Sequence, residues 1–191
     1  MMGDLKQLGR EFRNRQYEIS PDGLLFPAAG VLVGGHFTTE HIRKGKLLSI
    51  SADKNTVVDE GLMDILSIVF NAGTPIPSWY VAIFGGNYTP LSTDTGAVIA
   101  TNSTESGAYT ETGRQAWLPA APAANQITNS ASVATFTINA TTTIYGAFLI
   151  STATFGDTLG SLMAASKFAA PRPVVALDQL LITYTISAAN V

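Results

Sequence analysis

The chain has 191 residues, enough for one substantial core or for a core domain with an N-terminal extension. Charged residues make up only 13% of it, about half of the usual share of roughly 25%, and this low charge suits a surface that packs against copies or partners. There is no cysteine, which excludes a disulfide framework, a thiol nucleophile and a thiolate metal site.

The net charge of −3 is unevenly distributed along the chain. Residues 1–54 hold eight of the eleven Lys and Arg against six acids, which gives +2, and residues 55–191 hold three against eight, which gives −5. The basic residues are few and interleaved with acids, so they do not form a nucleic-acid footprint. They favour an arm that lies on an acidic partner surface.

Residues 1–20 are polar, with isolated apolar residues that are too few to fold alone. We therefore expect an N-terminal arm and extended segment over residues 1–54, followed by a β-rich core domain over residues 55–191. Within the first part, residues 36–50 are typical of a strand pair that turns at Lys44-Gly45-Lys46. No apolar run is long enough to span a membrane, and the first residues lack the apolar region of a secretory signal.

The strongest helix signal covers about residues 60–70. Asp59 is a favourable N-cap residue, and Leu62, Ile65, Leu66 and Val69 fall on one face at i, i+3, i+4 and i+7. This spacing, widened by two more apolar residues, predicts a buried helix. The run 79–84 (WYVAIF) predicts a buried strand that pairs with the helix in the core.

The second half of the chain predicts further strands. Residues 88–114 are interpreted as a long loop with one short strand over 97–100. Period-2 alternation over 133–139 places Ala134, Phe136 and Ile138 on one side of a strand. The same alternation over 179–187 places Leu180, Ile182, Tyr184 and Ile186 on one side of another. Residues 143–150 predict a buried strand in which Gly146 marks a bulge or a close backbone approach. The expected fold is mainly β, a β-sandwich or jelly-roll-like domain with one buried helix and an extended N-terminal arm.

No constellation of residues indicates catalysis, a metal or a cofactor. His36 and His41 are five positions apart and would face opposite sides of a strand. Asp59, Glu60 and Asp64 fit the start of a helix better than acid–base chemistry, and the acids of the loop 88–114 have no basic neighbour in the sequence. We therefore expect no enzymatic activity.

Several segments together resemble a family of known proteins. The segments are VVDEGLMDILSIVF, PSWYVAIFGGNYTP, SGAYTETGRQAWLPA, TIYGAFLIST and LLITYTIS. In their order and local sequence they are similar to segments of small virion proteins of tailed bacteriophages, over about residues 53–187. The resemblance implies a structural part of the particle, among head decoration or cement proteins. It implies assembly in the host bacterial cytoplasm, and contacts with the major capsid protein or other virion proteins.

Two alternatives stay open beside a decoration protein. A tail, fibre or baseplate component would share the same β domain and low charge. A carbohydrate-binding β module would need an exposed aromatic platform, for which the scattered aromatic residues are the candidates. We expect copies of the chain to associate, as a trimer in particular, because trimers suit the local threefold positions of capsids.

The candidate partner-contact residues lie in the N-terminal arm. They combine guanidinium groups, which pair with carboxylates, and aromatic rings, which fill pockets: Arg10, Phe12, Arg13, Arg15 and Tyr17. A neighbouring subunit or the outer face of a capsid shell could supply both kinds of partner.

Overall fold

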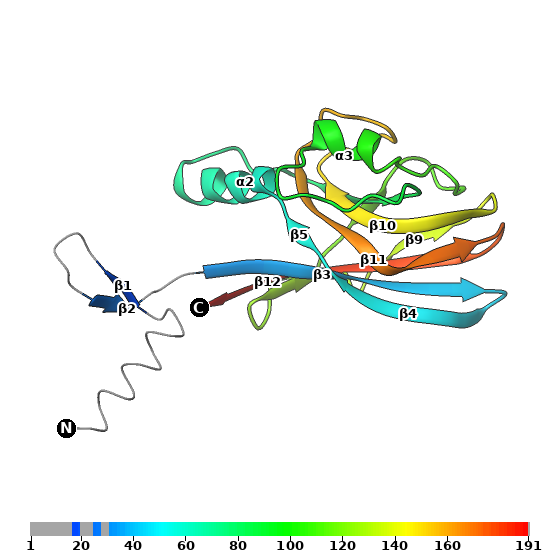
Figure 1. Ribbon diagram of the computed structural model, residues 1–191, viewed down its shortest axis with the longest axis horizontal. Helices are drawn as coiled ribbons and strands as arrows, with labels where there is room; N and C mark the ends of the chain where they lie inside the picture. Colours follow the sequence, from blue (N-terminus) through cyan, green and yellow to red (C-terminus); the bar gives the residue numbers. More distant parts are fainter. Residues whose placement is uncertain (1–16, 20–24, 28–30, 191) are drawn as a thin grey trace, which may run out of the picture. The chain divides into compact units, whose positions relative to one another are not determined.

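The computed structural model describes residues 17–19, 25–27 and 31–190 (Figure 1). The chain divides into two compact units, residues 1–33 with 188–191, and residues 34–187. In the first unit, β1 (Tyr17–Ile19) and β2 (Leu25–Pro27) form an antiparallel hairpin. The second unit starts before the position expected from the sequence, because the residues from His36 to Lys54 are paired strands of its sheet.

The second unit contains two antiparallel sheets, as the sequence predicted. The β10 sheet has the order β5 (Thr56–Val57), β11 (Leu162–Val174), β10 (Thr142–Ile150), β6 (Trp79–Phe84), β7 (Gln115–Trp117). The β12 sheet has the order β4 (Lys46–Lys54), β3 (Val31–Arg43), β12 (Gln179–Asn190), β8 (Gln126–Thr128), with β9 (Ala134–Thr137) also paired to β12. The hairpin predicted over 36–50 is β3–β4, and it turns at Lys44 and Gly45.

The main core lies between the two sheets. The alternation predicted for β9 and β12 is confirmed, since Phe136, Leu180, Ile182 and Tyr184 are buried in one cluster. The ring of Phe37 from β3 stacks on that of Tyr184 at 4.3 Å. Because apolar side chains alternate with polar ones along these strands, each sheet turns one apolar face to the other.

Gly146 allows β10 to pack closely against its neighbours. A Cβ atom at this position would collide with the Phe84 ring and with the Ser166 carbonyl oxygen. The pairing of β10 with β11 also shifts register between Ile144 and Gly146. The close approach predicted from the sequence is therefore confirmed, and a glycine is the residue that permits it.

A second, smaller core lies on the other face of the β10 sheet, under the helix α3 (Gly96–Asn102) (Figure 1). Ile99 of α3 packs there with Phe148 and Ile150 of β10 and with Phe84 of β6. The sequence predicted a short strand over 97–100, and this was wrong. The tertiary contact decided the conformation, because the weakly apolar segment GAVIATN pairs its apolar side with the sheet face and not with a strand edge.

The predicted helix exists as α2 (Asp59–Phe70), but the prediction that it is buried was wrong. Gly61 is its single buried residue. The strand that α2 contacts most is β11, whereas the predicted partner β6 is paired with β10 and β7. The N-cap is Val58, so Asp59 is the first helical residue.

Candidate interaction surfaces

The predicted arm residues lie at the edge of what the structure describes. Arg10, Phe12, Arg13 and Arg15 fall outside the described residues, and Tyr17 is the first residue of β1, with its side chain outside the description. The arm therefore stays a prediction from the sequence. The surfaces below belong to residues 34–187.

The outer face of α2, called here the α2 face, is the most exposed apolar feature of this unit. The exposed fractions are Leu62 36%, Met63 64%, Leu66 51%, Val69 63% and Phe70 80%. A single exposed leucine needs no explanation, but five large apolar residues on one helix form a continuous patch. Such patches mark contact sites on otherwise folded proteins.

The opposite side of α2 explains why the α2 face is open. Gly61 lies so close to β11 that a Cβ atom there would be 2.7 Å from the Met163 carbonyl oxygen, and Ile65 packs on the edge of the main core. The helix thus uses its smallest residue and one apolar row to attach to the sandwich. Because both of its sides are apolar, the sequence pattern could not show which side faces the core.

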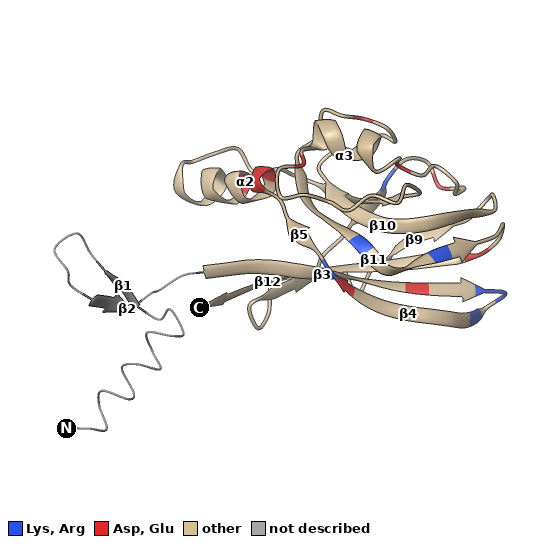
Figure 2. Ribbon diagram, in the orientation of Figure 1, with Lys and Arg blue, Asp and Glu red and all other residues tan. Residues whose placement is uncertain are grey.

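The charged residues of α2 are Asp59, Glu60 and Asp64, all in the first half of the helix. Asp59 and Glu60 lie in the first turn, and the last turn carries no basic residue. In Figure 2 the red of α2 lies in the half of the helix toward β5, and its last turn is uncharged. Glu60 also serves the fold, since its Oε2 accepts hydrogen bonds from the backbone N–H of Gly96 (2.8 Å) and of Leu162 (2.7 Å). This carboxylate joins the starts of α2, α3 and β11.

A second exposed apolar feature follows the edge strand β4. Leu47, Leu48 and Ile50 are about half exposed, and Lys46 and Lys54 lie at the two ends of the strand. Lysine on an edge strand opposes further strand pairing. We therefore regard β4 as a protected edge and the α2 face as the stronger candidate for contact.

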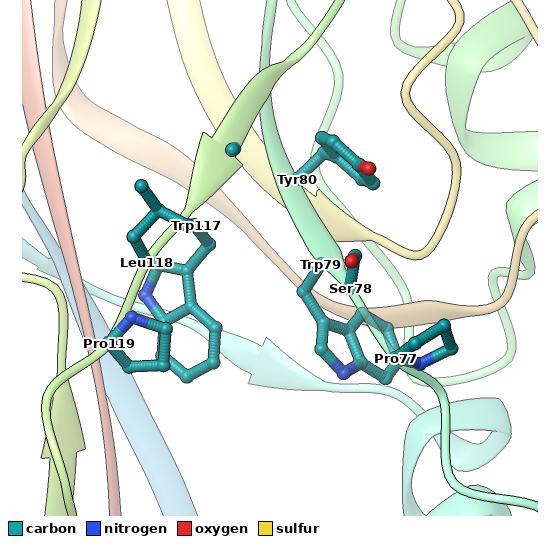
Figure 3. Close-up of a pocket in the computed structure, with 8 residues that line it drawn as sticks. Pro77, Ser78, Trp79, Tyr80, Trp117, Leu118 and Pro119 are labelled. Carbon is teal, nitrogen blue, oxygen red and sulfur yellow. The ribbon is translucent and has the colours of Figure 1, made fainter.

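A shallow pocket of about 270 Å³ lies where β6 begins and β7 ends (Figure 3). Trp79 and Trp117 are cross-strand partners on these two strands, and Leu118, Pro119 and Pro77 complete the apolar lining. Trp117 is buried and its Nε1 donates to the Tyr184 carbonyl oxygen at 3.1 Å, so it ties the two sheets together. Trp79 is half-buried and is the aromatic surface that a ligand in this pocket would meet.

The acids of the segment 88–114 hold the fold together. Glu105 has a basic partner that its sequence neighbourhood did not reveal: Arg114 donates to it through Nε and Nη2, both at 2.8 Å, and both side chains are buried. Arg114 also donates to the Thr152 hydroxyl and to the Asp157 carbonyl oxygen. The segment is therefore anchored to the loop before β11, and its acids are committed to structure.

Asp178 and His41 form another buried polar cluster. Arg43 donates to both oxygens of Asp178 at 2.7 Å, and His41 Nε2 lies 2.8 Å from Oδ2. The Arg43 hydrogen bond holds the pKa of Asp178 well below its ordinary value of 3.8. His36 lies on the other side of β3, opposite Lys54. Among the described residues no group of three potential ligands could hold a metal ion.

No protein-family model and no curated protein matches the sequence. In the part of the chain that the structure describes, no helix is long and apolar enough to cross a membrane.

Proposed function

We propose that this protein is a non-enzymatic structural subunit of a larger assembly, and specifically a capsid decoration protein that stabilises the head of a tailed bacteriophage. The α2 face carries the proposal, because an otherwise well-packed sandwich leaves five large apolar side chains in water. Exposure of this kind is unfavourable for an isolated monomer and is offset when a partner covers it.

The bonding of the titratable groups supports a structural role. Glu105, Asp178 and Glu60 each accept two or more hydrogen bonds from the protein itself. A general acid or base needs free access to a substrate proton. These groups instead join distant segments of the chain, which is useful in a subunit that must keep its shape inside an assembly.

The partners in this proposal are copies of the chain and the major capsid protein or other virion proteins, in a particle assembled in the bacterial cytoplasm. The positive balance of residues 1–54 suits an acidic shell surface. A tail, fibre or baseplate component would use the same features, and the location on the particle distinguishes the two.

The test is binding to particles that lack the protein. Heads and tails from a phage deleted for the gene are mixed with purified protein, sedimented, and imaged by cryo-electron microscopy. We expect regular added density on the head and a fixed ratio of bound protein to capsid protein. Density on the tail alone would support the alternative location, and no binding to either would contradict the proposal.

A carbohydrate-binding module is the second candidate, and the pocket beside Trp79 favours it. A half-buried indole next to an apolar wall can stack on a sugar ring. Titration with a panel of bacterial surface oligosaccharides, followed by tryptophan fluorescence, tests this candidate. A saturable change that disappears in Trp79→Ala would support it, and an unchanged spectrum across the panel would remove it.

A further inference from the structure

We infer that the α2 face packs against the α2 face of a second copy of this chain, as an antiparallel helix pair around a two-fold axis. The inference rests on the proposed function as an assembly subunit. It assigns the α2 face to one of the contacts between subunits. It differs from the trimer expected from the sequence.

The spacing of the exposed residues provides the first argument. Leu62, Leu66 and Val69 follow each other at i, i+4 and i+7, and Met63, Leu66 and Phe70 at i, i+3 and i+7. These are the spacings of a helix–helix seam, in which each side chain fits between those of a facing helix. Leu66 belongs to both rows and lies at their centre.

A two-fold axis at Leu66 makes this seam complementary to itself. The helix of the second copy then runs in the opposite direction, so that Leu66 meets Leu66 and Met63 meets Phe70 of the second copy. A thioether against an aromatic ring is a favourable contact. Every large side chain of the α2 face gains an apolar partner, and contacts of this self-complementary type are the usual basis of homodimers.

The charges select the antiparallel orientation. In a parallel pair or a parallel trimer, Asp59 and Glu60 of each copy would lie beside the same acids of the others. In the antiparallel pair these acids lie beside the last turn of the other helix, which carries no charged side chain to repel them. The two helix dipoles also oppose each other. Both features favour the two-fold arrangement.

The size of the α2 face suits a reversible dimer. Large apolar side chains present about 150–200 Å² each when fully exposed, so the exposed fractions correspond to roughly 500 Å² on each copy. Two copies would bury about 1,000 Å², the lower limit for a specific interface. We therefore expect dissociation on the order of micromolar in solution. Several such contacts on a particle would act together.

The absence of cysteine from the sequence makes a cross-linking test straightforward. Leu66→Cys in the full chain places one thiol at the proposed axis, and a short bismaleimide should convert the variant to a covalent dimer. Asp59→Cys is the orientation control, since two such thiols would lie about 20 Å apart in the antiparallel pair but side by side in a parallel one. Leu159→Cys, at a residue 90% exposed, is the control for random collision.

Efficient cross-linking of Leu66→Cys with little cross-linking of both controls is the expected result. Equal or greater cross-linking of Asp59→Cys would contradict the orientation, and equal cross-linking of all three would contradict a specific contact. A covalent link from Leu66→Cys to a different virion protein would show that another partner occupies the α2 face. Each of the last three outcomes would overturn the inference.

Sedimentation separates this inference from the proposed function. Wild-type protein should be a monomer–dimer mixture at micromolar concentration, and Leu66→Asp should be a monomer with an unchanged far-ultraviolet spectrum. If wild-type protein binds phage heads but Leu66→Cys gives no dimer in solution or on heads, the inference fails and the function stands. If the dimer forms through Leu66→Cys but heads and tails bind none of it, the function fails and the inference stands.

Discussion

Among the described residues there are two helices, and they relate to the sandwich in opposite ways. The seven-residue α3 has three buried residues and seals the outer face of the β10 sheet, whereas the twelve-residue α2 buries one and leaves its apolar face in water. α3 lies across the broad face of the sheet, and α2 is attached to β11 and extends past the end of the strands (Figure 1). Position relative to the sheets, and not apolar content, decides which helix is covered.

The comparison shows which parts of the protein serve stability and which serve contact. Residues under α3 remove apolar area from water within one chain, so they contribute to the free energy of unfolding of the monomer. Residues of the α2 face can contribute only when a partner is present. Substitutions on the two helices should therefore separate stability from assembly.

The largest effect is expected next to α3, at the buried ion pair. Arg114→Met leaves the Glu105 carboxylate buried without its partner, which costs about 3–5 kcal/mol of unfolding free energy. Urea unfolding followed by circular dichroism measures the loss. The double variant Arg114→Met/Glu105→Gln should recover part of it, because no unpaired charge remains. A loss below about 1 kcal/mol would show that the pair is solvated.

The next largest difference is expected between truncating a buried side chain on α3 and truncating an exposed one on α2. Ile99→Ala creates a cavity between α3 and Phe148 and should cost about 3 kcal/mol. Val69→Ala removes similar apolar atoms from the exposed side of α2 and should change stability by less than about 0.5 kcal/mol. Both are measured by urea unfolding at a concentration at which the protein is monomeric. Equal losses would refute the distinction between the helices.

Two adjacent residues test the two sides of α2. Ile65→Asp places a carboxylate at the margin of the main core, next to Asp64, and should cost about 2 kcal/mol. Leu66→Asp faces water and should stay within about 0.5 kcal/mol of the wild type in the monomer. Thermal unfolding of dilute protein gives both values. The reverse order would mean that the helix is rotated relative to the structure described.

The smallest effect is expected at Asp178, far from both helices in the sequence. Its pKa is below 3.8 in the folded protein, so its stabilising contribution is present above that pH and is lost as the pH falls toward the lowered pKa. Asp178→Asn should cost about 1–2 kcal/mol at neutral pH. Unfolding measured from about pH 5 to pH 2 should show a smaller decrease in stability for the variant. Identical slopes would mean that the carboxylate is not held by Arg43.

Much of the strand content could be predicted from local sequence alone. Alternation in β9 and β12 identified which residues face the core, because the side-chain period of a strand is two and does not depend on the rest of the fold. The turn at Lys44-Gly45 and the close approach at Gly146 were predicted for the same kind of reason. Each is a steric property of a few neighbouring residues.

The segment 88–114 shows where local sequence was insufficient. Two of its contacts lie far along the chain: Glu105 accepts from the N–H of Gly156 as well as from Arg114 at the end of the segment, and the start of α3 is held by Glu60. No pattern within the segment indicates these contacts. The helix α3 forms because a sheet face and a distant carboxylate are available to it, which local propensity cannot express.

The sequence by itself determined that residues near 60–70 form an apolar helix, since its periodicity and its acidic start are local properties. Only the tertiary structure decided which side of that helix faces the protein. Gly61 permits close contact with β11 on one side, and the large side chains of the α2 face have no element of the described chain to cover them. Burial depends on what lies opposite a surface, and a sequence pattern specifies the surface alone.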